Sequence, residues 1–219
     1  MFIHTHPYPP FIPDNATKLI VGTLPPPRFT TGDLKPDDVN FCYGSRDGML
    51  WRILDRIFEL NLVFDNTDFP IKQRKDFLVK QRIGICDIVD SAEREKIDAS
   101  DLGMRNIKLR DLVGYLKKYP KVDTLLFTGG NSKNGPEYFF RRHLREYKLS
   151  LKLVEKSTPK IHQVEIDGRT VKTVSLTAPT GTANIAVGSN PLYKQLKVKN
   201  PEFNTFDFRV MQYREFFER

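Results

Sequence analysis

The stretch KLIVGTLPPP, residues 18–27, joins a short apolar run to a loop of glycine and proline. Three further runs have the same character: RIGICDIV (82–89), VDTLLFTG (122–129) and VKTVSLTA (171–178). Each run is too short for a helix and is typical of a strand that is buried on both faces. These runs, the first taken as 18–24, therefore predict one parallel or mixed central sheet.

Helical patterns lie between the predicted strands. Residues 49–60, MLWRILDRIFEL, place Leu50, Ile53, Leu54 and Ile57 on one apolar stripe. Further helical stretches are predicted at 109–119 and 137–147, and a last strand or helix at 206–217. Residues 152–156 and 160–175 are predicted to be antiparallel, because IDGR (166–169) carries the Asp-Gly turn signature. This alternation predicts a single three-layer α/β/α domain, residues 1–219, around a central, mainly parallel four-stranded sheet.

Composition limits the classes of protein that fit. The chain has 219 residues, of which 39% are hydrophobic and 28% are charged, a globular balance. Two cysteines, Cys42 and Cys86, are too few for a disulfide scaffold or a four-cysteine zinc site. No apolar run approaches the roughly 18 residues of a membrane span, and the N-terminus lacks the basic and apolar regions of a signal peptide. We therefore expect a cytoplasmic protein without a membrane partner.

The net charge of +8 lies entirely in one half of the chain. Residues 1–110 carry 16 basic and 16 acidic side chains, whereas residues 111–219 carry 19 basic and 11 acidic ones. A basic half favours a polyanion partner, of which nucleic acid is the commonest. The alternative is a solvated basic surface without a ligand.

The loops that follow the predicted strands form a candidate binding site. They start at Gly22, Asp87, Thr128 and Thr177, and they are small, polar and rich in glycine and proline. Because ligands of open α/β sheets collect outside the carboxyl ends of the strands, these loops predict a cleft at one sheet edge. The first strand is followed by neither G-x-G-x-x-G nor a P-loop, and no G-x-S-x-G elbow is present. We expect no cofactor and no metal.

A further unusual segment, FCYGSRDG (41–48), runs directly into the helix at 49–60. The order GTLPPP, YGSRDGMLWRIL, GICDIVDS, LLFTGG and LTAPTGTAN resembles the uracil-DNA glycosylase superfamily over about residues 18–190. It looks closest to the mismatch-uracil and hypoxanthine glycosylase branches. The resemblance implies an enzyme that flips a damaged or deaminated base out of DNA and hydrolyses its N-glycosidic bond.

The resemblance also implies which residues bind the substrate. Gly22 and Pro25 match a first motif whose backbone lines the base pocket, and the main chain of Gly22–Thr23 would help to hold the base. Tyr43, eight residues before Trp51, matches the aromatic residue on which the base stacks, and Phe41 is its alternative. The late loop that would enter the minor groove includes Thr177 and Thr180 and closes at Asn184.

Two positions depart from the pattern of the family. Leu24 stands where an acid or amide is common, and Gly48 stands where asparagine is expected. Asp47 is therefore the best-placed carboxylate to orient the attacking water; its alternative role is that of a helix N-cap. The same departures favour a second hypothesis, a nucleic-acid or nucleotide-binding module that kept the fold and lost hydrolysis. A third, an enzyme of free nucleobases, would need no basic face. We expect a monomer that binds duplex or single-stranded DNA through the basic residues of its C-terminal half.

Overall fold

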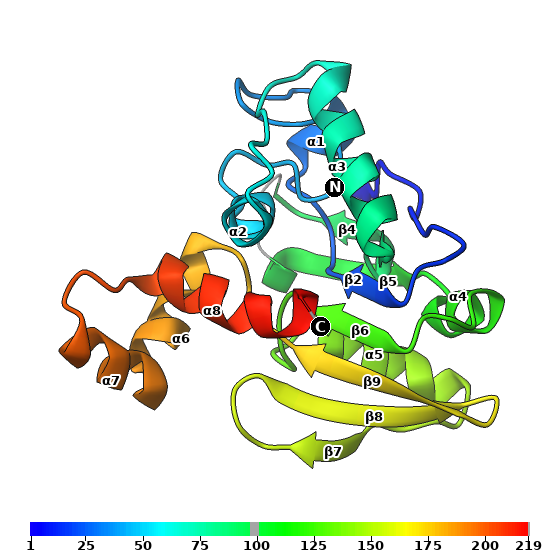
Figure 1. The fold of residues 1–219 in the computed structure, drawn as a ribbon. Coiled ribbons are helices and arrows are strands. Elements are labelled where there is room, and N and C mark those ends of the chain that lie inside the picture. The colour runs from blue at the N-terminus through cyan, green and yellow to red at the C-terminus, as the bar shows by residue number, and fades with distance from the viewer. Residues whose placement is uncertain (97–100, 219) are drawn as a thin grey trace.

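A six-stranded sheet forms the centre of the computed structural model, which describes residues 1–96 and 101–218 (Figure 1). The strand order is β3-β2-β6-β9-β8-β7. The first four strands in this order are parallel to one another, and β8 and β7 are antiparallel to their neighbours. Their bounds are β2 Lys18–Val21, β3 Ile83–Ile85, β6 Thr124–Phe127, β7 Lys152–Glu155, β8 Lys160–Ile166 and β9 Arg169–Ser175.

The four predicted runs do share this sheet, but the expected number of four strands is wrong. The predicted antiparallel segments extend the sheet, because β8 pairs with β9 along its whole length through the turn at Asp167 and Gly168. Both turn residues have positive φ, 49° and 77°, which Asp-Gly pairs tolerate. Every residue of the edge strand β7 is exposed, including the apolar Leu153 and Val154.

Helices cover both faces of the sheet, as the three-layer prediction requires. Neighbouring strand residues point to opposite faces: Ile20 packs with α2, α3 and α8, whereas Leu19 and Val21 pack with α4 and α5. The helices are α2 Leu50–Phe58, α3 Asp68–Gln81, α4 Leu112–Lys118, α5 Pro136–Glu146 and α8 Thr205–Phe217. None of the helices in the described residues is long and apolar enough to span a membrane.

A second, antiparallel sheet was not predicted. Its strand order is β1-β4-β5, and it pairs the N-terminus with the chain after β3. The strands are β1 Phe2–Thr5, β4 Val89–Arg94 and β5 Met104–Leu109. Just after β1, His6 N donates to Asp90 O at 2.8 Å, which fixes the start of the chain beside the strand ends of the central sheet.

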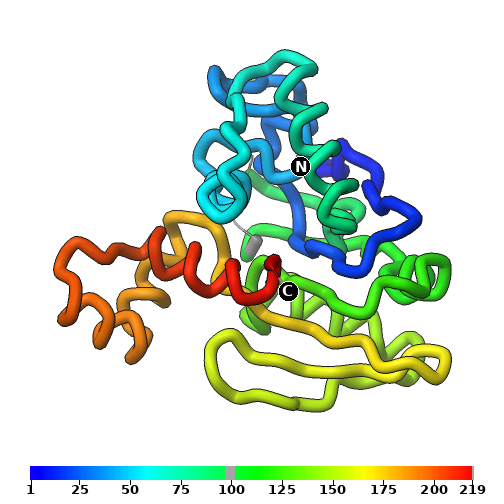
Figure 2. Tube along the Cα trace, in the orientation of Figure 1, coloured from blue at the N-terminus to red at the C-terminus, as the bar shows by residue number. Residues whose placement is uncertain are grey.

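The chain leaves the body of the fold after β9 and then returns to it. Two short helices, α6 Asn184–Ser189 and α7 Pro191–Lys199, extend away from the rest of the molecule, on the side towards which the β9 arrow points (Figures 1 and 2). We call residues 184–199 the α6–α7 arm. Helix α8 then leads back and packs on α2. Its start is fixed by a capping box between Asn204 and Asp207.

Candidate functional site

The carboxyl ends of the parallel strands bring the predicted loops together. Val21 in β2 pairs with Phe127 in β6, and Phe127 pairs with Ser175 in β9, so the three strands end at one level. Backbone hydrogen bonds continue the alignment into the loops, since Thr128 N donates to Val21 O and Leu176 N to Phe127 O. The loops that begin at Gly22, Thr128 and Thr177 therefore emerge at one edge of the sheet.

A buried carboxylate, Asp87, lies at this edge and accepts three hydrogen bonds. Only 5% of the residue is exposed. Its Oδ1 accepts from Gly22 N at 2.7 Å and from the Tyr43 hydroxyl at 2.8 Å, and its Oδ2 lies 3.0 Å from His6 Nε2. Because His6 Nδ1 accepts from Tyr8 N at 3.2 Å, the ring proton belongs on Nε2, which donates to Asp87. Asp87 thus fixes three segments that are far apart in sequence.

Gly22 has no room for a side chain. A Cβ atom there would collide with the Tyr43 hydroxyl and come within 2.8 Å of Asp87 Oδ1. Its N–H already donates to Asp87 and is not available to a ligand. Gly22 can contribute to a site by letting its backbone come close to a ligand. The first motif therefore packs directly against the predicted stacking residue.

Tyr43 is held by its hydroxyl. Besides donating to Asp87, this oxygen lies 3.2 Å from Thr128 Oγ1. Burial, followed by the charge of Asp87, raises the pKa of Tyr43 well above its usual value, so the hydroxyl stays protonated. Its backbone adopts a left-handed conformation with φ of 58°. The residue as a whole is half-buried.

Phe41, the alternative stacking residue, belongs to the aromatic core. It is 5% exposed, and its ring centroid lies 6.4 Å from that of Tyr8, 6.2 Å from that of Phe11 and 6.2 Å from that of Trp51. The Trp51 indole in turn donates to Cys42 O at 2.8 Å. Phe41 and Trp51 therefore position the backbone on either side of Cys42, next to Tyr43.

Asp47 lies on the surface of the loop before α2. Its side chain is 69% exposed, and Oδ2 lies 3.4 Å from Arg28 Nη2. The stronger partner of Arg28 is buried Asp38, at 2.7 and 2.8 Å. Asp47 does not cap α2: no side chain among the described residues caps this helix, and Met49 N donates to Pro179 O. The carboxylate is thus exposed, and the N-cap alternative does not hold.

Helix α8 holds the loop that runs from Thr177 to Asn184. Arg209, which is fully buried, donates to Ala178 O and Thr180 O at 2.9 Å each and to Asn184 Oδ1 at 3.0 Å. Burial lowers the pKa of its guanidinium. The loop also bonds to the next turn of α8, since Thr177 N donates to Gln212 Oε1 and the Tyr213 hydroxyl donates to Thr177 O.

The remaining predicted residues divide between buried and exposed positions. Pro25 is buried and Thr23 is half-buried, whereas Thr180 and Asn184 are exposed on the loop that Arg209 holds. The structure thus brings Gly22 and Tyr43 into contact through Asp87, and it places Thr177, Thr180 and Asn184 together on a separate loop. Phe41 and Asp47 lie outside the Asp87 cluster.

Sequence reasoning missed two residues that organise the edge, His6 and Arg209. It found Asp87 as the start of a loop, directly after the apolar run RIGIC, but not as the carboxylate that links Gly22 to Tyr43. In the described ranges, no group of three or more His, Cys, Asp or Glu side chains could hold a metal ion.

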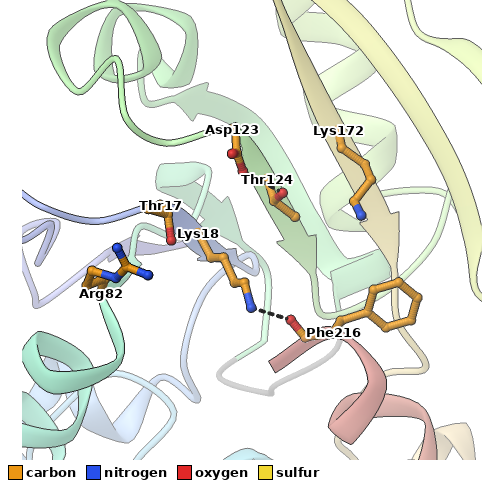
Figure 3. A pocket seen from close by; sticks show the side chains of 7 residues that line it. All are labelled: Thr17, Lys18, Arg82, Asp123, Thr124, Lys172 and Phe216. Carbon is orange, nitrogen blue, oxygen red and sulfur yellow. Dashed lines mark hydrogen bonds between the residues drawn. The ribbon is translucent and has the colours of Figure 1, made fainter. Parts of the chain in front are cut away.

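A cavity of about 320 Å³ lies elsewhere, beside the first residues of β2 and β6 (Figure 3). Lys18 spans it and donates to Phe216 O at 2.8 Å, which ties the end of α8 to the sheet. Lys172 and Asp123 also line the cavity. Since these residues stand at the amino ends of the parallel strands, this cavity is not the predicted cleft.

Comparisons with known proteins support the fold alone. No family model matches the chain, and no curated protein matches it. A solution NMR structure from Methanosarcina acetivorans, provisionally assigned as a uracil DNA glycosylase, superimposes with a TM-score of 0.54 at 17% sequence identity. The match covers 94% of this chain and 98% of that one, so the two proteins share their overall architecture.

Proposed function

We propose that this protein is a DNA glycosylase that flips a deaminated or damaged base, such as uracil or hypoxanthine, into the carboxyl edge of its sheet. The observation that carries the proposal is the contact of Gly22 with Tyr43, both held by buried Asp87. It joins the two motifs that resemble the base pocket of the superfamily. The shared architecture with the M. acetivorans protein supports the same assignment.

Each part of the edge has a role in this proposal. The base stacks on the ring of Tyr43, next to the closely approaching backbone of Gly22, Thr23 and Pro25. The loop that carries Thr177, Thr180 and Asn184 contacts the DNA strand from which the base is extruded. Stacking of one base on an aromatic side chain is worth about 1–3 kcal/mol. Asp87 touches no substrate in this scheme and acts by positioning Tyr43.

Asp47 is the proposed catalytic carboxylate. Hydrolysis adds water to C1′ of the nucleotide and releases the base with the bonding electron pair, and a carboxylate near C1′ orients that water and offsets the positive charge that develops on the sugar. The exposure of Asp47 leaves it accessible to DNA. Its pair with Arg28 is weak enough to exchange, since Arg28 keeps two shorter bonds to Asp38.

Base release from defined oligonucleotides tests the proposal. Duplexes and single strands containing uracil, hypoxanthine, xanthine or a thymine mismatch are incubated with the protein and then treated with alkali, which breaks the strand at an abasic site. We expect breakage with at least one modified base and none with unmodified DNA. Tyr43→Ala serves as the matched variant, because a contaminating glycosylase would not respond to it.

A second candidate function is DNA binding without hydrolysis. Two observations favour it: half-buried Leu24 packs on the apolar core at the position of the usual polar residue, and Asp47 pairs with a cation. In that case the protein binds the same oligonucleotides and leaves every base in place. Binding measured beside base release separates the two functions.

A further inference from the structure

The basic charge of the C-terminal half is not spread evenly over the fold. Several of its cations are used internally: Arg141 pairs with Glu137, Lys117 with Asp167 and Arg214 with Glu218. Arg169 donates to backbone carbonyls, as does buried Arg209. The three cations with carboxylate partners contribute little to an external field, and buried Arg209 is not accessible to a ligand.

The α6–α7 arm is different. No acidic residue occurs between Asp167 and Glu202, and α7 carries Lys194, Lys197 and Lys199. All three lysines are exposed, and none of them forms an ion pair within residues 1–96 and 101–218. Among the described residues, Lys197 donates a side-chain hydrogen bond to the neutral carbonyl oxygen of Pro201. The arm therefore presents three positive charges without a compensating anion on the same segment.

The arm is also built as a projection. No residue of α7 is buried, and its Tyr193 ring packs 6.0 Å from the ring of Phe203 and 5.9 Å from that of Phe208. Figure 2 shows this segment extending beyond the body of the protein. The arm begins at Asn184, whose side chain Arg209 holds at the carboxyl edge. A long polyanion seated at that edge would pass along it.

We propose that the α6–α7 arm is a phosphate-contacting element that binds the DNA backbone beside the carboxyl edge. The inference rests on the proposed function for the identity of the polyanion. The lysines contact phosphates as point charges, so they add affinity without reading sequence. The alternative partner is an anionic membrane surface, because Ile185 and Val198 on the same arm are 86% and 83% exposed.

The salt dependence of DNA binding tests the arm. Binding of the full chain to a fluorescent, unmodified duplex is measured between about 50 and 200 mM salt for the wild type and for the triple variant Lys194→Gln, Lys197→Gln, Lys199→Gln. The slope is that of the logarithm of the binding constant against the logarithm of the salt concentration. Each lost phosphate contact reduces its magnitude by about 0.9. The wild type should therefore lose about 40-fold more affinity than the variant over this range.

Two matched variants complete the design. Lys152→Gln, Lys156→Gln, Lys160→Gln removes the same charge from exposed positions on and beside β7 and β8, and it should keep nearly the wild-type slope. Arginine at 194, 197 and 199 should restore the slope, since it retains the charge. Equal slopes for the two glutamine variants would overturn the proposal. The proposal would also be overturned if the full chain bound phosphatidylserine vesicles through these lysines and did not bind DNA.

The outcome is distinct from that of the proposed function. If the triple variant of the arm lowers the salt slope of DNA binding but the wild type releases no modified base, the inference about the arm stands and the glycosylase proposal fails. If a base is released while the arm variant keeps the wild-type slope, the glycosylase proposal stands and the arm is not a phosphate contact.

Discussion

The guanidinium of Arg209 in α8 donates to Oδ1 of Asn184, 25 residues earlier in the chain, at 3.0 Å. The same side chain donates to Ala178 O and Thr180 O, so one buried cation sets the shape of the loop that ends at Asn184. In the described part of the chain its hydrogen-bond acceptors are carbonyl and amide oxygens, without a carboxylate among them. The C-terminal helix is therefore part of the architecture of the candidate site.

Replacing Arg209 should destabilise the protein and loosen the loop. Arg209→Met removes the part-buried hydrogen bonds to the carbonyl oxygens of Ala178 and Thr180, and a hydrogen bond from a charged donor contributes about 1.5–3 kcal/mol. Urea unfolding measures the loss of stability, and hydrogen exchange of residues 178–184 measures the loosening. The control is Arg214→Met, whose exposed pair with Glu218 should contribute little. Equal stabilities for the two variants would show that Arg209 does not hold the loop.

Adding a methyl group at Gly22 should disturb the Asp87 cluster. Gly22→Ala forces the new Cβ into the Tyr43 hydroxyl, and overpacking of this kind costs about 1–3 kcal/mol. Gly130→Ala is the matched control, because no atom lies within 4 Å of a Cβ there. Thermal unfolding of both variants checks the difference. A Gly22→Ala protein as stable as the Gly130→Ala protein would mean that the contact with Tyr43 is not tight.

Asp47→Ala should slow the chemical step and leave the fold intact. Removing a positioned acid–base group lowers a rate by about 10²–10⁴-fold. DNA affinity should stay almost unchanged, because a carboxylate makes no favourable contact with phosphate. Single-turnover base release and binding constants measure the two effects, with Asp68→Ala on α3 as an exposed acidic control. Undiminished base release by Asp47→Ala would remove this residue from the catalytic role.

Acid should destabilise the protein through His4. Burial, followed by the charges of Arg94 and His6, lowers the pKa of His4 from 6.5 to about 4. The unfolded chain thus takes up a proton at a higher pH than the fold does, so the stability from neutral His4 is complete above pH 6.5 and falls as the pH drops towards 4. Urea unfolding at both ends of this window should show a smaller loss for His4→Gln than for the wild type. Equal losses of unfolding free energy in the two proteins would show that His4 is not the source of the acid sensitivity.

The sequence predicts the central sheet well because its signal is local. Inner strands such as β2 and β6 are apolar on both faces, and the β8–β9 turn carries its own Asp-Gly signature. The small sheet was missed because β1 pairs with residues 91–94, and neither segment has a sequence pattern that indicates its partner. An element whose partner lies 90 residues away is defined by tertiary contact.

The same distinction applies to the candidate site. Gly22 and Tyr43 are found through motifs that are contiguous in the chain. Their link to each other is Asp87, which is 65 residues from Gly22 and 44 from Tyr43, and only the folded register brings it there. Likewise, no local pattern around Arg209 indicates that its side chain reaches Thr180, 29 residues away.

Release of a free base from DNA tests the central claim most directly. The wild type and Tyr43→Ala are incubated with each modified duplex under single-turnover conditions, and the liberated base is quantified by mass spectrometry. We predict that the wild type releases at least one of uracil, hypoxanthine, xanthine or mismatched thymine, and that Tyr43→Ala loses about 1–3 kcal/mol of base capture. A wild-type protein that binds these duplexes at low salt and releases no base would contradict the claim and leave DNA binding as the function of this edge.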